Sequence, residues 1–126
     1  MKIILAIKPK YSEKILSGEK LFEFRKRLFK RSDVKIVLIY SSSPIKKIIG
    51  EFQISDLLHL PISELWDKTS QNSGVTKQEF YNYFNYQTYG YALKIKNVIK
   101  YDTPKTLQEF DIKYPPQSFI YLTKTE

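Results

Sequence analysis

Segments of apolar residues, each about the length of one β-strand, recur along the chain with helical patterns between them. The expected strands cover residues 2–8, 21–27, 34–40, 45–55, 89–101 and 119–122. One expected helix spans residues 9–17, and two more begin at Pro61 and at Thr76, before the fifth strand. Five or six short strands with this set of helices predict an α+β domain around a small curled sheet. The pattern leaves three architectures open, namely a barrel, a sandwich and a half-open sheet.

The apolar pattern also predicts the places of some residues within this sheet. Residues 34–40 are apolar on both faces, which is typical of a central strand. Gly50 interrupts its strand, which indicates a bulge or a close approach of another backbone. In the fifth strand, Ile99 is expected on the buried face, opposite a row of lysines that is either a solvated face or a track for a phosphate backbone. Beyond this strand, Thr103 and Pro104 are expected to cap a short helix.

The junction between the first helix and the second strand holds a compact group of charged residues. Gly18 is expected to end the helix in a left-handed conformation. Alternation along the following strand places Glu23 and Arg25 on the same face, roughly 6.5 Å apart along the strand. Two interpretations are open. Either these two side chains form a surface ion pair, worth about 0–1 kcal/mol, or they converge with Lys20 on a polar ligand in a cleft.

Charge and composition narrow the classes of partner and site. Lysine and arginine number 21 against 13 acidic residues, so the net charge is +8. This excess predicts a polyanion partner, nucleic acid before membrane, unless lysine is simply enriched throughout the source genome. With no cysteine and a single histidine, His59, to which no role is assigned, we expect no disulfide, no metal site and no cofactor. No apolar run approaches the ~20 residues of a membrane span, so we expect no membrane partner and a cytoplasmic location.

The charged group also resembles a known family signature. Gly18, Lys20, Glu23 and Arg25 reproduce the G-x-K-x-x-E-x-R motif of the ASCH domain, a branch of the PUA-like superfamily. The order of the expected elements is similar to that family over nearly the whole chain, and residues 114–119 resemble the ending of small stand-alone prokaryotic ASCH proteins. The resemblance implies a PUA-like small β-barrel of five to six mostly antiparallel strands with flanking helices. It also implies a single domain over residues 1–126.

The resemblance further implies a basic cleft beside the barrel that takes RNA, single-stranded nucleic acid or a nucleoside. The motif places Lys20, Glu23 and Arg25 in its wall, and the positions of the strand ends add the other candidates. The candidate ligand-binding residues are Lys8, Lys20, Glu23, Arg25, Tyr40, Ser41, Ser42, Ser43, Gln117 and Ser118. Tyr40 or Tyr114 is a candidate to stack on a splayed base, which is worth about 1–3 kcal/mol.

Three alternatives to pure binding stay open. Some bacterial ASCH proteins are amidohydrolases acting on acetylcytidine, which use the motif lysine, a hydroxyl three residues later and a glutamate before the second helix. Here Lys20 matches, but Glu23 stands at the hydroxyl position and no acid lies near residues 72–74. The second alternative is a ribonuclease with Lys20 and Glu23 as catalytic residues, and the third is a protein-interaction module in transcription regulation. The sequence leaves the oligomeric state open.

Overall fold

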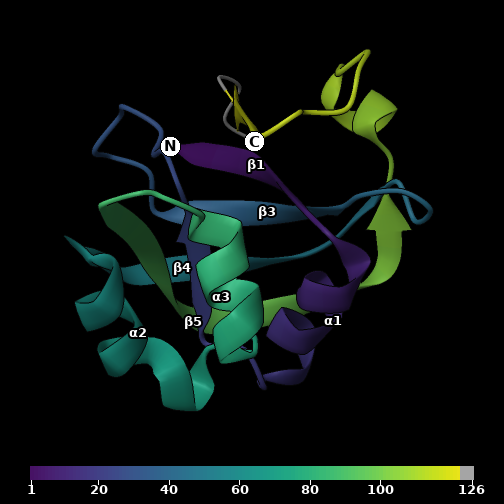
Figure 1. The fold of residues 1–126 in the computed structure, drawn as a ribbon. Helices are drawn as coiled ribbons and strands as arrows, with labels where there is room; N and C mark the ends of the chain where they lie inside the picture. The colour runs from purple at the N-terminus through teal and green to yellow at the C-terminus, as the bar shows by residue number, and fades with distance from the viewer. Residues whose placement is uncertain (123–126) are drawn as a thin grey trace.

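The computed structural model describes residues 1–122, which form one mixed sheet with helices packed against it. The elements in chain order are β1 (Lys2–Ile7), α1 (Pro9–Ser17), β2 (Phe22–Arg25), β3 (Ile36–Ser41), β4 (Lys47–Pro61), α2 (Ile62–Thr69), η1 (Ser70–Asn72), α3 (Lys77–Phe84), β5 (Tyr89–Lys105), η2 (Leu107–Phe110) and β6 (Phe119–Leu122). Figure 1 shows α2 and α3 next to one another, with α1 on the same side of the sheet. The predicted α+β class is confirmed.

The sheet contains six strands and places β1 between β3 and β6. Its strand order is β2-β5-β4-β3-β1-β6. Of the five ladders between the described strands, the one that joins β1 and β3 is parallel and the other four are antiparallel, as predicted. β3 lies between β4 and β1, so its two apolar faces did indicate an inner strand. Among the described residues no ladder joins the outer strands β2 and β6, so the barrel-like sheet stays open on that side.

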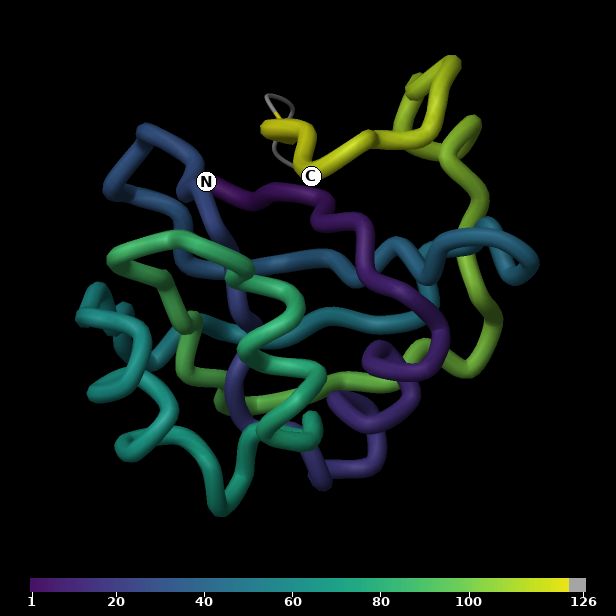
Figure 2. The backbone as a smooth tube through the Cα atoms, viewed as in Figure 1, coloured from purple at the N-terminus to yellow at the C-terminus, as the bar shows by residue number. Residues whose placement is uncertain are grey.

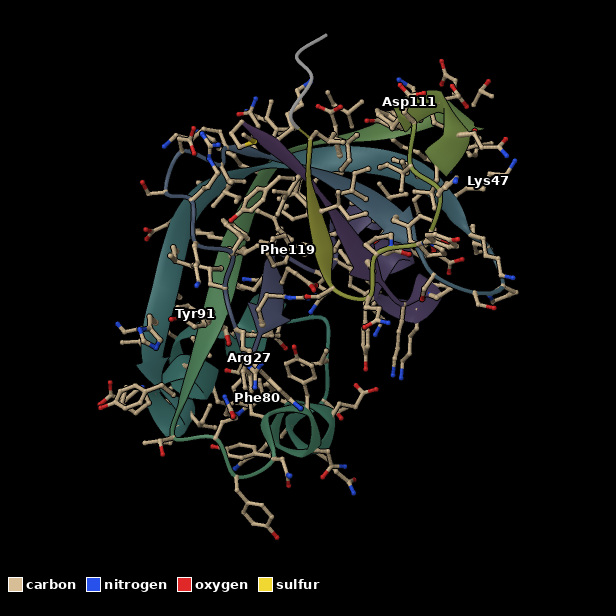
Figure 3. The ribbon with its side chains drawn as sticks, turned by 90° about the horizontal axis from the view of Figure 1, so that it is seen from above. Arg27, Lys47, Phe80, Tyr91, Asp111 and Phe119 are labelled. Carbon is tan, nitrogen blue, oxygen red and sulfur yellow. The ribbon has the colours of Figure 1, made fainter. Side chains whose placement is uncertain are left out.

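Buried side chains form three clusters, and one of them fixes the helices beside β2. The main cluster packs α1 against β1, β3 and β5 through residues such as Ile15 and Ile3. A smaller cluster lies on the other face of β1, around Ile4. The third joins β2 and β5 to α2 and α3, with Phe80 of α3 only 1% exposed. Figure 3 shows Phe80 on the side of α3 that faces the sheet. Burying such a phenylalanine stabilises the fold by about 1.5–3 kcal/mol.

Both helices of this third cluster begin where the sequence predicts. Pro61 immediately precedes α2. In α3, the side chain of Thr76 accepts a hydrogen bond from the Glu79 backbone N–H, and the Glu79 side chain accepts one from the Thr76 N–H. This reciprocal capping box satisfies two backbone donors that a helix start would otherwise leave unpaired. The start of α3 is therefore fixed by local sequence.

The two longest strands, β4 and β5, extend past their predicted ends and lie next to one another in the sheet (Figure 2). β4 was expected to stop at residue 55, but it continues to Pro61 and pairs with β5 as far as Tyr89. The prediction of a bulge at Gly50 is confirmed, because the register shifts beside it in both neighbouring ladders. A Cβ at Gly50 would lie 2.5 Å from the Ile99 carbonyl oxygen, so a close backbone approach accompanies the bulge.

The predicted orientation of Ile99 is wrong. Its side chain is 52% exposed, whereas that of Val98 packs against the main core. Between Lys96 and Ile99 the β5 chain uses three steps where β4 uses two, and Asn97 adopts a positive φ of 51°. A one-residue bulge of this kind reverses which face each later residue points to.

The predicted cap of the last short helix is also wrong. Thr103 and Pro104 belong to β5, which ends at Lys105. The short helix η2 follows, and its capping residue is Thr106, which accepts a hydrogen bond from the Glu109 N–H. Thr103 and Thr106 both suit the start of a helix. Because β5 stays paired with β4 as far as Lys105, the helix begins after Thr106.

Candidate functional site

A pocket of about 750 Å³ lies between the start of α1, the strand β2, the helix α3 and the loop that leads into β6. Its walls combine aromatic rings of α1, β2 and α3 with charged and hydroxyl side chains from the ends of the strands. The three charged residues of the motif, Lys20, Glu23 and Arg25, all line it. The fold therefore agrees with the second interpretation of the motif, a cleft with three charged side chains in its wall, and not with a surface ion pair.

Lys20 is buried against the segment that connects η1 with α3. Its side chain is among the largest fully buried ones, with 2% of the residue exposed, and its Nζ donates to the Ser73 carbonyl oxygen at 2.8 Å. Gly74 makes this approach possible. It has a φ of 70°, and a Cβ there would lie 2.5 Å from the Lys20 Cβ. The loop therefore closes over the stem of the lysine and holds its ammonium from one side.

Burial lowers the pKa of Lys20. Desolvation lowers the pKa of this ammonium from 10.5 to about 8, and the nearby Glu23 carboxylate opposes the change. The Nζ also lies 4.7 Å from the ring centre of Phe24 and 5.4 Å from that of Tyr11. Aromatic faces attract a cation at these distances. Lys20 is thus a cation at the wall of the pocket that loses its proton at a lower pH than an ordinary lysine does.

Glu23 is buried beside it, with 6% of the residue exposed. Burial raises the pKa of its carboxyl group above 4.5, while Lys20 and Arg25 act in the opposite direction. The Glu23 Oε2 accepts from the Arg25 Nη1 at 3.4 Å, which is a long contact. The side chain of Arg25 is only 15% exposed, so this pair is not the solvent-exposed surface pair of the first interpretation.

Arg25 joins the two open edges of the sheet. Its other terminal nitrogen, Nη2, donates to the Ser118 Oγ, on the residue just before β6. Because β2 and β6 are the outer strands, this contact bridges the open side of the sheet. Arg25 therefore both contacts the buried carboxylate and closes the pocket on the side of β6.

A second acid in the pocket, Glu79, was assigned only a capping role from the sequence. Its Oε1 accepts from the Thr76 N–H at 2.8 Å, while its Oε2 accepts from the Lys10 Nζ and, at 3.1 Å, from the Tyr11 hydroxyl. These contacts hold the pKa of Glu79 down at about 2, chiefly through Lys10. Glu79 thus connects α1 to α3 across the pocket. Only its capping box gave a signal in the sequence, since its partners in α1 are far away along the chain.

The structure brings together seven of the ten predicted site residues. The residues that line the pocket are Lys8, Lys20, Glu23, Arg25, Ser42, Gln117 and Ser118. Their role in binding a ligand stays a prediction.

The other three lie outside the lining of this pocket. Tyr40 is 3% exposed and packs in the cluster around Ile4, and Ser41 is buried with its hydroxyl bonded to that of Ser12 at 2.9 Å. Both are the last residues of β3 and not loop residues, which explains their burial. Ser43 is exposed in the turn beyond. Tyr114, the other candidate for stacking on a base, is 76% exposed and also outside the lining.

Two other kinds of feature were searched for in residues 1–122. In this range no cluster of three or more His, Asp or Glu side chains is arranged to hold a metal ion. No helix within it has the length and apolar character needed to cross a bilayer.

Comparison with known protein families gives a match over most of the chain. The family model for the ASCH domain matches residues 5–119. An ASCH domain-containing ribonuclease from Zymomonas mobilis is 25% identical over 126 residues, which covers 98% of this chain and 85% of that protein. This relative is similar in length as well as in sequence.

Two further relatives are much longer than this chain, and both come from Ureaplasma parvum. A large ribosomal subunit protein uL22 is 37% identical over 86 residues, and an ATP synthase subunit alpha is 32% identical over 124 residues. The matches cover 68% and 95% of this chain but only 28% and 15% of those proteins. The similarity is thus confined to a small part of each longer relative.

Solved structures give the same fold. ASCH from Zymomonas mobilis superposes with a TM-score of 0.89 at 23% identity, covering 98% of this chain and 88% of that one. Its tyrosine-to-phenylalanine variant gives 0.88 at 22% identity, covering 98% and 91%. At this level of identity the likeness establishes the shared fold.

Proposed function

Because the chain belongs to the ASCH domain family, we propose that it binds RNA or another single-stranded nucleic acid, with one nucleotide entering the pocket between α1, β2 and α3. The proposal treats residues 1–126 as one domain of this family, working in the cytoplasm. A free nucleoside is the smaller form of the same ligand.

One observation carries the proposal, namely that the motif lysine, glutamate and arginine line a single pocket with aromatic walls. Arginine offers a planar fork for phosphate, and lysine a compact positive charge. Aromatic faces stack on any base, for about 1–3 kcal/mol each. Among the rings that line the pocket, Tyr83 is the exposed one, at 39%. Charge and aromatic content therefore both suit a nucleotide.

The net charge and the relatives support the same class of ligand. A net charge of +8 attracts a polyanion from solution. The Zymomonas relative that this chain matches over 85% of its length is called a ribonuclease, so its substrate is RNA by name. We take from it the class of ligand alone.

Fluorescence anisotropy with a labelled single-stranded RNA tests the proposal. The affinity should fall steeply with salt, because each phosphate contact makes the slope of log K against log salt more negative, by about 0.7 for a single strand. Lys8→Ala at the pocket should weaken binding several-fold. It should also make that slope less negative by about 0.7, the share of one phosphate contact. Lys47→Ala is the matched control, since it removes the same charge from an exposed residue outside the lining of the pocket. No affinity at low salt, or equal losses in both variants, would contradict the proposal.

A ribonuclease activity is the second candidate, and the raised pKa of the Glu23 carboxyl group, which makes it a stronger base, favours it. Glu23, whose pKa is raised, would take the proton from a 2′-hydroxyl, and Lys20 would stabilise the charge that develops on the phosphorane. A labelled RNA should then be cut by the wild type and left intact by Lys20→Met. The cleavage is followed with and without magnesium, and an RNA that stays whole in both removes this candidate.

The amidohydrolase and the protein-interaction module receive less support. Glu23 stands where the hydrolase has a hydroxyl, and the Lys20 ammonium is held by the carbonyl oxygen of Ser73 where that mechanism uses a carboxylate. Release of acetate from acetylcytidine, lost in Lys20→Ala, would reverse this ranking. For a protein-interaction module, no affinity for RNA even at low salt would be the first indication.

A further inference from the structure

Three aromatic side chains form an exposed group on the sheet, outside the lining of the pocket. The rings of His59 in β4 and Tyr91 in β5 are stacked, with their centres 4.1 Å apart and their planes 8° from parallel. The ring centre of Tyr89 lies 5.5 Å from that of His59. His59 is exposed, Tyr89 is 51% exposed and Tyr91 is half-buried. We call these three residues the aromatic platform.

The aromatic platform adjoins the pocket at Arg25. In the ladders of the sheet Arg25 lies opposite Tyr91, and Tyr91 lies opposite His59. Residues directly opposite one another in antiparallel strands point to the same face of the sheet. Because neighbouring strands are about 4.8 Å apart, the row from Arg25 to His59 is roughly 10 Å long. Arg25 also lines the pocket, so the platform continues the site along one face of the sheet.

The end of the core leaves the platform accessible from solvent. The ladder between β3 and β4 ends at Gln53, and among the described residues β5 is the strand that pairs with β4 beyond it. His59 therefore has a neighbouring strand on one side. Leu93, two residues beyond Tyr91 on the same face, is buried in the main cluster. The rings of the platform thus lie just outside the core, and the core does not cover them.

We infer that the aromatic platform is a second subsite for single-stranded nucleic acid, where the nucleotide that follows the one in the pocket stacks its base on the ring of His59. Unpaired bases of RNA are commonly bound by stacking on aromatic side chains, including rings on the face of a sheet. A net charge of +8 favours a nucleic acid over a protein as the occupant. This inference rests on the proposed function, because it extends the same ligand beyond the pocket.

The expected effect depends on the length of the ligand. Stacking of one base on an aromatic side chain changes affinity by about 5- to 150-fold, with little preference among bases. A nucleoside monophosphate is long enough for the pocket alone, whereas a three-nucleotide RNA also reaches the platform. The affinity for the monophosphate therefore reports on the pocket, and the gain in affinity of the longer ligand reports on the platform.

Calorimetric titrations with uridine monophosphate and with a three-nucleotide uridine RNA, at the same low salt concentration, test the inference. His59→Ala should weaken binding of the RNA at least five-fold and leave the affinity for the monophosphate unchanged. His59→Phe keeps a flat ring and should bind the RNA as the wild type does. Tyr86→Ala is the matched control, since it removes a ring that is 95% exposed and belongs neither to the pocket lining nor to the platform.

A fluorescent base tests the stacking itself. The base 2-aminopurine, an analogue of adenine, loses fluorescence when it stacks, and it is placed at either the 5′ or the 3′ end of the uridine RNA. The wild type should quench the fluorescence at one of these ends. His59→Ala should abolish this quenching at protein concentrations that saturate the RNA, whereas His59→Phe should retain it. A purely structural effect of His59 on affinity would not change the quenching of the saturated complex.

The outcomes separate this inference from the proposed function. An affinity for the RNA that is the same in His59→Ala and in the wild type overturns the second subsite and leaves the pocket in place. An equal loss of affinity for the RNA and for the monophosphate also overturns it, because His59 would then act through the pocket. Absence of binding of both ligands to the wild type overturns the inference and the proposed function together.

Discussion

Lys20 and Glu23 are buried at 2% and 6% exposure in the wall of one pocket, yet they do not form an ion pair with one another. Lys20 is held by a backbone carbonyl oxygen, and Glu23 by a long contact to Arg25. Two buried charges of opposite sign usually approach one another to offset the cost of leaving water. Because Lys20 and Glu23 are not paired with one another, a ligand that contacted both groups would offset part of that cost.

Lys20 should make the protein more stable as the pH rises from about 8 towards 10.5. The folded protein lowers the pKa of this amine to about 8, so in this range the unfolded chain binds more protons than the folded one. The free energy of unfolding should increase by up to about 3 kcal/mol. Tyr11 and Tyr101, whose pKa values are raised, act in the opposite direction near pH 10.

Urea unfolding of the wild type and of Lys20→Met, measured across this range, separates these contributions. The tyrosines are present in both proteins, so the difference between the two curves isolates Lys20. Parallel curves would show that Lys20 is not desolvated in solution.

Gly74→Ala should destabilise the protein more than Gly18→Ala does. Both glycines have a positive φ, 70° and 87°, so both substitutions cost about 1 kcal/mol in backbone strain. A Cβ at Gly74 would also lie 2.5 Å from the Lys20 Cβ, whereas a Cβ at Gly18 meets no atom within 4 Å. We expect an additional loss of about 1–3 kcal/mol at Gly74, together with weaker RNA binding. Chemical denaturation of the two variants measures their losses of stability. Equal losses would mean that the loop at Gly74 moves away from Lys20 freely.

Arg25→Ala should cost about 3 kcal/mol of stability, because it leaves the Glu23 carboxylate buried without its hydrogen-bonded partner. Ser118→Ala removes only one contact at the edge of the sheet and should cost about 1 kcal/mol. Adding Glu23→Gln to Arg25→Ala should restore part of the lost stability, since the unpaired charge is then gone. Thermal unfolding of the four proteins tests this, and a double variant less stable than Arg25→Ala would contradict it.

Glu79 should titrate at about 2 in the folded protein, well below the ordinary value of 4.5. Since this pKa is lowered, the stabilisation is present above pH 4.5 and is lost as the pH falls from 4.5 towards 2. Carbon-detected NMR of the glutamate carboxyl groups measures the pKa directly. Lys10→Ala should raise it, because Lys10 is the largest cause of the shift. An unchanged value would place the cause in the capping of α3 instead.

The sequence predicted the features that depend on neighbours along the chain. The capping box at Thr76, the left-handed end of α1 at Gly18 and the bulge at Gly50 are all confirmed. Each is set by the backbone preference or hydrogen bonds of residues within one turn of helix or one strand. The motif likewise predicted that Lys20, Glu23 and Arg25 face the same space.

Long-range packing decided what those three residues meet. Lys20 and Ser73 are 53 residues apart, Tyr11 and Glu79 are 68 apart, and Arg25 and Ser118 are 93 apart. Alternation in a strand gives the direction of a side chain, but not what covers it. A pKa depends on that cover, because only the folded structure removes water from around a charge. The sequence by itself therefore determined which charges face the pocket, and the tertiary structure decided that Lys20 and Glu23 are buried there without forming an ion pair.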